Sequence, residues 1–315
     1  MKKPLIGMFA ALLFAGATAL AGAPAAVASS PAEARTALTQ TAVTQTALAQ
    51  AEILAQPDAL AQASSQDQQA PAAVNFAGTV ALSNCSGSLV RLPSSAATDP
   101  ALILSNGHCL ETGFPGPGEV VVNQSSSRTF SLLNGAGSKV ATLRATKVVY
   151  GTMTDTDVSI YQLNTTYAAI QSSYGIAPLT VSASHPVQGT SIKVVSGYWK
   201  KIYSCSVDGF VYRLKEGSWT WKDSVRYTSS CNTIGGTSGS PVVDAGTGQV
   251  VAVNNTGNED GQRCTDNNPC EVDQNGVVTV RQGINYAQET YGIPACFAAG
   301  NRLDLTRSGC TLPRP

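Results

Sequence analysis

From about residue 73 onward, short apolar runs recur along the chain, and Gly, Pro, Asn and Ser separate them. The runs are rich in Val, Ile, Thr and Tyr, which is typical of strands in sandwiches and barrels. The predicted strands are 78–82, 86–92, 101–105, 119–122, 140–143, 146–150, 158–163, 191–195, 250–253 and 277–280. A single segment, 285–291, has a helical pattern. The pattern therefore predicts an all-β domain with a short C-terminal helix.

The first residues have the pattern of a targeting segment. A basic start, Met1-Lys2-Lys3, precedes an apolar run from Leu5 to Leu20, and Ala26-Val27-Ala28 fits a small-x-small cleavage site. Residues 1–28 are therefore predicted to be a secretory signal peptide, and the protein is predicted to be secreted and extracellular. A retained membrane anchor fits less well, because the run is short for a span of about 20 apolar residues.

Residues 29–72 are dominated by Ala, Gln, Thr and Ser and contain no Gly, Cys or aromatic residue. They lack the large apolar side chains that build a core. A propeptide removed from a zymogen and a plain linker fit this low-complexity segment equally well. The length of the remainder, 73–315, suits one large all-β domain.

All eight cysteines lie in that domain, and an even number behind a signal peptide predicts disulfides formed in an oxidising compartment. Spacing alone does not determine which cysteines pair. Sequential pairing is the simplest hypothesis: Cys85 with Cys109, Cys205 with Cys231, Cys264 with Cys270, and Cys296 with Cys310.

No metal or cofactor is predicted. The cysteines lack the paired CxxC spacing of zinc sites. The segment 258–276 carries Asp260, Asp266 and Asp273, and oxygen-rich loops can hold calcium. Without EF-hand spacing, a surface loop closed by a disulfide is the favoured interpretation. Lys plus Arg and Asp plus Glu balance at 20 each, so no charge attracts nucleic acid or an anionic membrane.

The candidate chemistry centres on Ser238, within the stretch Gly235-Gly236-Thr237-Ser238-Gly239-Ser240-Pro241. Glycine tolerates tight, otherwise strained turns. Such a turn could direct the N–H groups of Gly236 and Ser238 at one point, as an oxyanion hole requires. Taken alone, the stretch fits a Gly/Ser-rich hairpin loop equally well. A catalytic interpretation needs a base and an orienting acid elsewhere in the chain.

His108 is the candidate base, because it follows the predicted strand 101–105 and adjoins Cys109. The second histidine, His185, precedes Pro186 in a predicted loop. Asp157 leads into the apolar strand 158–163 and is the candidate acid. Asp155 would share its face in an extended chain and is the fallback. Turn capping by both aspartates is the alternative.

In the order His108, Asp157, Ser238, the chain resembles the trypsin/chymotrypsin-like serine proteases, whereas subtilisin-like enzymes and α/β-hydrolases use other orders. Four motifs carry the resemblance, in order along the chain: Cys85-Ser-Gly-Ser-Leu-Val, Gly107-His-Cys, Asp157-Val-Ser-Ile and Gly236-Thr-Ser-Gly-Ser-Pro. Glycine stands at 107 where the family has alanine. The resemblance implies two six-stranded antiparallel β-barrels with a cleft between them. It also implies a Ser-His-Asp triad and oxyanion donors at Gly236 and Ser238.

Two departures concern activation and specificity. Thr237 replaces the aspartate of trypsins, so it cannot pair with a new N-terminus after zymogen cleavage. Thr237 to Pro241, with Thr233 upstream, resembles secreted bacterial glutamyl endopeptidases of the V8-like type. Asn232 lies where trypsins have an acid, and Asn254 lies where glutamyl endopeptidases have a histidine.

By the resemblance, the stretch from Val253 to Gly257 is expected to line the substrate channel and to pair with the substrate backbone. The candidate substrate-binding residues are Asn232, Thr233, Val253, Asn254 and Asn255. These residues do not determine which substrate residue is preferred at the cleavage site. The sequence thus predicts a secreted, monomeric serine endopeptidase acting on protein or peptide substrates. The alternatives are an inactive protease-like binding protein and a non-proteolytic esterase.

Overall fold

The computed structural model describes residues 73–315, so the predicted signal peptide (1–28) and the Ala/Gln-rich segment (29–72) lie outside the described residues. The first half of the described chain is an antiparallel barrel in the order β1-β5-β6-β7-β3-β2, closed by the pairing of β2 with β1. Its strands are β1 (Thr79–Ala81), β2 (Ser86–Arg91), β3 (Pro100–Ser105), β5 (Thr129–Leu133), β6 (Lys139–Thr152) and β7 (Val158–Thr166). β4 (Val120–Ser125) pairs with β6, and β8 (Leu179–Thr180) lies parallel to β2.

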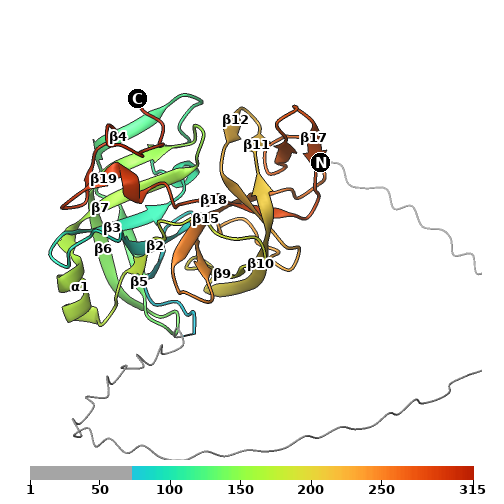
Figure 1. The fold of residues 1–315 in the computed structure, drawn as a ribbon. Coiled ribbons are helices and arrows are strands. Elements are labelled where there is room, and N and C mark those ends of the chain that lie inside the picture. The colour runs from blue at the N-terminus through green and yellow to red at the C-terminus, as the bar shows by residue number, and fades with distance from the viewer. Residues whose placement is uncertain (1–72) are drawn as a thin grey trace, which may run out of the picture. The chain divides into compact units, whose positions relative to one another are not determined.

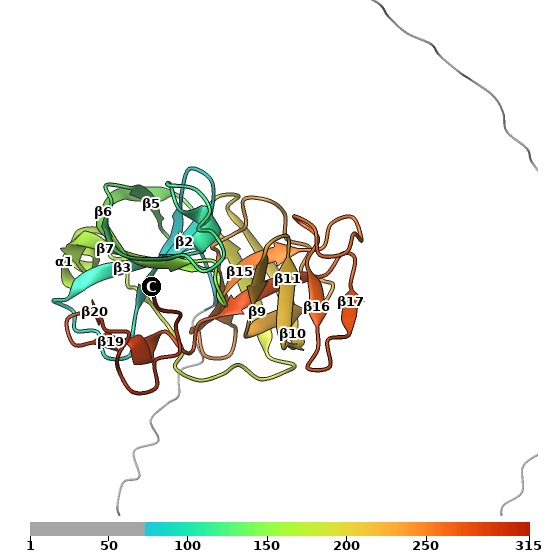
Figure 2. The same cartoon turned by 90° about the horizontal axis from the view of Figure 1, so that it is seen from above.

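The second half forms another closed antiparallel barrel, in the order β10-β13-β18-β15-β14-β9. Its strands are β9 (Ser191–Ser196), β10 (Lys201–Val211), β13 (Ser224–Tyr227), β14 (Pro241–Asp244), β15 (Val250–Gly257) and β18 (Asn285–Glu289). The two barrels lie side by side (Figure 1), and Figure 2 looks down onto the ring of the first. The predicted all-β class with two six-stranded barrels is confirmed.

A four-stranded sheet, β12-β11-β16-β17, extends from the second barrel. It consists of β11 (Arg213–Glu216), β12 (Trp219–Trp221), β16 (Cys270–Val272) and β17 (Val278–Val280). The predicted disulfide-closed loop 258–276 contains β16. Cys264 forms its disulfide with Cys270, which is the first residue of this strand. The segment 258–276 is thus part of the folded domain and lies beside the cavity described in the next subsection.

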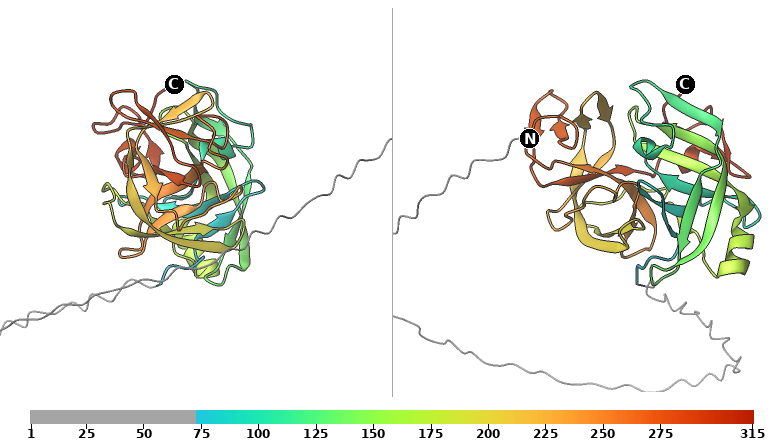
Figure 3. Two further views of the ribbon diagram at one scale, coloured as in Figure 1. Left: turned by 90° about the vertical axis from the view of Figure 1, so that its right-hand side faces the viewer. Right: turned by 180° about the vertical axis from the view of Figure 1, so that it is seen from behind.

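An apolar cluster holds the two barrels together. Val90 and Leu102 of the first barrel pack in one cluster with Val195 and Val243 of the second. Phe297 of the C-terminal segment joins the same cluster, because the chain returns to the first barrel after β18 (Figures 1 and 3). Each such side chain contributes about 1.5–3 kcal/mol when fully buried, so the relative position of the barrels is strongly stabilised. The segment that crosses back contains η2 (Pro294–Cys296), β19 (Phe297–Ala298) and β20 (Arg302–Leu303).

The predicted C-terminal helix over 285–291 is wrong, because this segment is strand β18. All five residues of β18 are buried between β13 and β15. A strand covered on every side shows no two-residue alternation, so its pattern does not distinguish it from a short helix. The α-helix of the described chain is α1 (Tyr167–Tyr174), which Thr166 caps at its N-terminus and Gly175 ends in the left-handed conformation.

All four disulfides follow the sequential pairing: Cys85–Cys109, Cys205–Cys231, Cys264–Cys270 and Cys296–Cys310. Each bond closes a short segment and therefore limits the conformations of the unfolded chain. Within residues 73–315, no helix has the length and apolar character needed to cross a membrane.

Candidate active site

The imidazole of His108 is held by a buried carboxylate. His108 lies in the short helix η1 (Gly107–Cys109), which follows β3, and Asp157 directly precedes β7. The Nδ1 atom of His108 is 2.6 Å from Oδ2 of Asp157, and the backbone N–H of His108 donates to Oδ1 at 3.0 Å. The Asp157 side chain is fully buried, whereas 17% of the His108 side chain is exposed. This geometry leaves Nε2 of the ring available on the exposed side.

The backbone around this pair is held by several neighbours. The Cys85–Cys109 disulfide ties η1 to β2. The Asn106 side chain donates to the Asp157 carbonyl oxygen at 2.8 Å, and the Ser159 hydroxyl donates to the Asn106 carbonyl oxygen at 2.6 Å. A geometry held in this way keeps the imidazole oriented without any substrate present.

Gly107 has a steric reason to be glycine. A Cβ atom at this position would lie 2.0 Å from the carbonyl oxygen of Thr152 and 3.0 Å from Oδ1 of Asp157. Backbone of β6 thus fills the space that an alanine methyl would need. The family resemblance shows that glycine replaces alanine at position 107, but the steric reason is visible only in the structure.

Asp157 raises the basicity of the imidazole. Burial lowers the pKa of His108, but the charge of Asp157, its hydrogen bond and the charge of Glu216 outweigh burial, so the pKa lies above 6.5. A neighbouring carboxylate stabilises the imidazolium and thereby strengthens the ring as a base.

The two alternative residues lie elsewhere. Asp155, the fallback acid, forms an ion pair with Lys222. His185 packs against Phe210 and Tyr291, and its Nε2 atom lies 3.2 Å from a carboxylate oxygen of Glu289. Neither residue is paired with His108.

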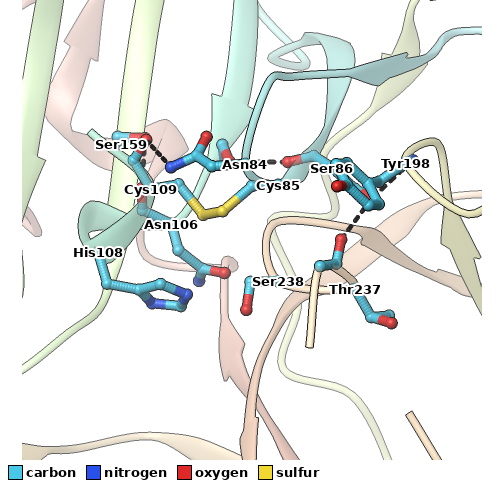
Figure 4. Close-up of a disulfide and its surroundings, with 12 residues drawn as sticks. Asn84, Cys85, Ser86, Asn106, His108, Cys109, Ser159, Tyr198, Thr237 and Ser238 are labelled. Carbon is cyan, nitrogen blue, oxygen red and sulfur yellow. Dashed lines mark hydrogen bonds between the residues drawn. A yellow bond between two sulfur atoms is a disulfide. The ribbon is translucent and has the colours of Figure 1, made fainter. Parts of the chain in front are cut away.

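Ser238 and His108 line the same cavity. Figure 4 shows the His108 ring directed toward Ser238, below the Cys85–Cys109 disulfide. In this structure the Ser238 hydroxyl donates to the carbonyl oxygen of Asn255 at 3.3 Å, a long hydrogen bond. No hydrogen bond joins Ser238 to His108 in the described chain. In enzymes without bound substrate, the hydrogen bond between a catalytic hydroxyl and its base is often long or poorly aligned, and it shortens when substrate binds.

The loop before Ser238 takes a glycine-dependent conformation. Gly236 has φ +86° and Gly239 has φ +80°, both in the left-handed region. A Cβ on Gly239 would lie 2.1 Å from the Ser86 carbonyl oxygen. Across residues 73–315, the backbone N–H groups of Gly236 and Ser238 donate to no partner. Two neighbouring free donors beside a serine hydroxyl have the arrangement that an oxyanion hole would require.

The cavity has a volume of about 530 Å³ and is lined by four of the five predicted substrate-binding residues. These are Asn232, Thr233, Asn254 and Asn255. Val253 is not a lining residue, because its side chain is fully buried and packs with Tyr150 and Val158. The Thr233 hydroxyl donates to the Asn285 side chain at 2.6 Å, which gives that part of the wall an uncharged polar surface.

Sequence reasoning missed one whole wall of the cavity, formed by Phe114, Glu216 and Trp219. Phe114 meets the His108 ring edge-on at 5.8 Å between centroids and meets Trp219 at 6.0 Å. Burial raises the pKa of Glu216 above its usual value. Phe114 comes from the loop after η1, whereas Glu216 and Trp219 face each other at the ends of the paired strands β11 and β12. None of the three belongs to a local motif, so no signal in the chain pointed to them.

The cavity lining contains Glu216, Glu259 and Asp266 but neither Lys nor Arg. The lining therefore offers no permanent positive charge to an acidic side chain of a substrate. Cys85, His108 and Cys109 are the one group of potential metal ligands that gathers within the described residues. Both sulfurs belong to the disulfide, so they do not offer the thiolates that a metal would bind.

Comparison with known proteins identifies a matching family. The family model described as trypsin-like peptidase domain matches residues 85–253. None of the curated proteins compared matches the chain. Among solved structures, the thermostable serine protease AL20 from an extremophilic microorganism is 15% identical, with a TM-score of 0.41 over 68% of this chain and 91% of that one. The Nocardiopsis protease NAPase is 14% identical, with a TM-score of 0.39 over 69% and 93%. The protease domain of MamO from Magnetospirillum magneticum is 12% identical, with a TM-score of 0.41 over 67% and 91%.

Proposed function

This chain belongs to the trypsin-like peptidase domain family, and from that premise we propose that it is a secreted serine endopeptidase working through Ser238, His108 and Asp157. One observation carries the proposal. A buried carboxylate holds Nδ1 of an imidazole at 2.6 Å, and the imidazole shares its cavity with a serine on a glycine-rich turn. A histidine with a purely structural role in the core would have no reason to direct Nε2 toward such a cavity.

The proposed reaction begins when the Ser238 hydroxyl rotates from the Asn255 carbonyl oxygen toward Nε2 of His108. Its oxygen attacks the scissile carbonyl carbon while Nε2 takes the proton, and Asp157 stabilises the resulting imidazolium. The N–H groups of Gly236 and Ser238 bind the oxyanion. Collapse of the intermediate breaks the C–N bond, and His108 returns the proton to the leaving amine.

The acyl-enzyme that remains is an ester of Ser238. Water replaces the departed amine, and His108 takes a proton from that water as it attacks the ester carbonyl. A second tetrahedral intermediate then collapses, releases the acid product and returns the proton to Ser238. The same oxyanion donors serve both halves of the reaction.

Four disulfides support the proposal that the protein works outside the cytosol, because such bonds persist in oxidising compartments. The aromatic wall of Phe114 and Trp219 and the amides of Asn254 and Asn255 support the binding of an extended peptide. The residue preferred at the cleavage site depends on this lining, which contains the carboxylates of Glu216, Glu259 and Asp266 but neither Lys nor Arg.

The test is covalent labelling of the purified protein with a fluorophosphonate, followed by cleavage of a mixed peptide library. We expect label on Ser238 and cleavage within peptides, with both lost in Ser238→Ala. Ser172→Ala, on the exposed surface of α1, is the matched control and should behave as the wild type. A folded wild-type protein that takes no label would instead favour the inactive binding protein. Hydrolysis of esters without hydrolysis of amides would favour the esterase.

A further inference from the structure

The turn between β9 and β10 places an aromatic side chain against the loop that precedes Ser238. Trp199 lies in this turn and keeps 48% of its surface exposed. Its indole Nε1–H donates to the carbonyl oxygen of Gly235 at 2.7 Å. An exposed indole could donate to water instead, so this short hydrogen bond to a specific peptide is a selective contact.

The hydrogen bond determines where the next N–H points. In a trans peptide the C=O of one residue and the N–H of the following residue point in opposite directions. Because Trp199 holds the Gly235 carbonyl oxygen, the Gly236 N–H is directed away from the indole. This N–H is one of the two free donors proposed to bind the oxyanion.

The peptide between Gly235 and Gly236 joins two residues that have no Cβ. Gly235 has free space around it, since a Cβ built there would meet nothing within 4 Å, whereas Gly236 packs against the same aromatic turn, where a Cβ would lie 2.9 Å from Nε1 of Trp199 and 3.0 Å from Cδ1 of Tyr198. Glycine populates both signs of φ, so rotated orientations of this peptide lie close in energy. A single hydrogen bond therefore has a large influence on which orientation is populated.

The other oxyanion donor is held independently. The Thr237 carbonyl oxygen, opposite the Ser238 N–H, accepts from the N–H and hydroxyl of the buried Ser240 at 3.1 and 2.6 Å. The N–H of Ser86, in the first barrel, donates to the Ser238 carbonyl oxygen at 2.8 Å. Ser238 is thus anchored by buried groups, whereas the Gly235 carbonyl oxygen depends on a half-exposed side chain.

We propose that Trp199 is a positioning residue that orients the Gly235–Gly236 peptide and so keeps the Gly236 N–H available to the oxyanion. The inference rests on the proposed function and adds a residue outside the cavity lining to it. Trp199 itself touches neither the substrate nor the reacting atoms. Its effect is exerted on the transition state, since the oxyanion exists only there and in the tetrahedral intermediates.

The experiment compares the wild type with Trp199→Phe, which keeps an aromatic ring but loses the donor. The matched control is Tyr198→Phe, which removes only the hydroxyl of the neighbouring ring in the same turn. Within the described chain this hydroxyl makes no hydrogen bond. Trp199→His restores a ring N–H at the same exposed position. Thermal unfolding of each variant establishes that it is folded before activity is compared.

Kinetics on an amide substrate give the first readout. A neutral hydrogen bond changes a population by about 2- to 10-fold, and complete loss of one oxyanion donor costs about 10²- to 10³-fold in kcat. We expect kcat of Trp199→Phe to fall about 10-fold with KM within about 2-fold of the wild type. Tyr198→Phe should match the wild type, and Trp199→His should recover part of the loss.

Vibrational spectroscopy of an acyl-enzyme gives the second readout, the stretching frequency of its ester carbonyl. This frequency would not change if Trp199 only stabilised the fold. Cinnamoylimidazole acylates the serine, and hydrogen bonds to the resulting ester carbonyl lower its stretching frequency. We expect a higher frequency in Trp199→Phe than in the wild type or Tyr198→Phe. An unchanged frequency and kcat in folded Trp199→Phe would overturn the inference while leaving the protease intact. A wild type that is never acylated would overturn the proposed function and this inference with it.

Discussion

Gly107 gives the sharpest prediction about the link between backbone packing and catalysis. The perturbation is Gly107→Ala, which adds one methyl group next to His108. The added Cβ would stand 2.0 Å from the Thr152 carbonyl oxygen and 2.7 Å from the Thr152 carbonyl carbon. Ordinary non-bonded contacts lie at about 3.5–4.0 Å, so η1 and β6 must separate by more than about 1 Å.

The magnitude follows from two consequences of that shift. Overpacking a close-packed interior costs about 1–3 kcal/mol of unfolding free energy. At about 2–4 °C for each kcal/mol, the melting temperature should fall by about 2–12 °C. The shift also displaces His108, whose N–H donates to Asp157 at 3.0 Å. A misplacement of about 1 Å costs about 10²-fold in rate, so kcat/KM should fall by that order.

The assay combines thermal unfolding with kcat/KM on one peptide amide, measured well below the melting temperature. Gly116→Ala is the matched control, because its new Cβ would meet Glu119 at an ordinary 3.7 Å. The control should change neither quantity. A Gly107→Ala protein that melts within about 1 °C of the wild type and retains its rate would refute the steric argument, because the shift would then have no cost.

Three further predictions concern charge. Because the pKa of His108 is raised above 6.5 by Asp157, the base form is lost on acidification, and the acid limb of a kcat/KM profile should have its midpoint above pH 6.5. The cavity contains no Lys or Arg, so a peptide with Glu before the cleaved bond should react more slowly than its Gln counterpart; a faster Glu peptide would contradict this. Burial and the charge of Asp223 raise the pKa of Glu289 from 4.5 to about 8. The folded state therefore binds the extra proton between these values, and stability falls as pH rises through that window. Glu289→Gln should weaken this fall in denaturation curves at pH 5 and pH 9, whereas an unchanged pH dependence would exclude Glu289 as its source.

Local patterns in the sequence determined much of the architecture. Enrichment in β-branched residues between turn signals predicted most strands of the first barrel, because these strands are short and bounded by Gly, Pro and Asn. The even cysteine count and the sequential pairing hypothesis were confirmed at all four disulfides. The positions of His108 and Asp157 beside predicted strands make them the candidate base and acid, and the structure brings them within hydrogen-bond distance.

Burial hides the pattern of strand β18, which is covered on every side, so its sequence predicts a helix where the structure has a strand. The sequence analysis also lacks β10 to β13, although β10 alternates between buried and more exposed residues along most of its length. In β15, the predicted channel residues include Val253, although its side chain is buried in the core beside Tyr150 and Val158. A local window does not show which face of a central strand meets a cavity, since that depends on the neighbours that the fold supplies.

Local patterns along the chain predict the class of the fold, the disulfide framework and the order of His108, Asp157 and Ser238. The absence of room for a methyl group at Gly107, the cavity wall of Phe114 and Trp219, and the hydrogen bond from Trp199 to the Gly235 carbonyl oxygen are seen only in the folded protein. These contacts join residues that are far apart along the chain. Residues far apart in sequence meet only after both barrels close and an apolar cluster sets them side by side, and no local pattern records such contacts.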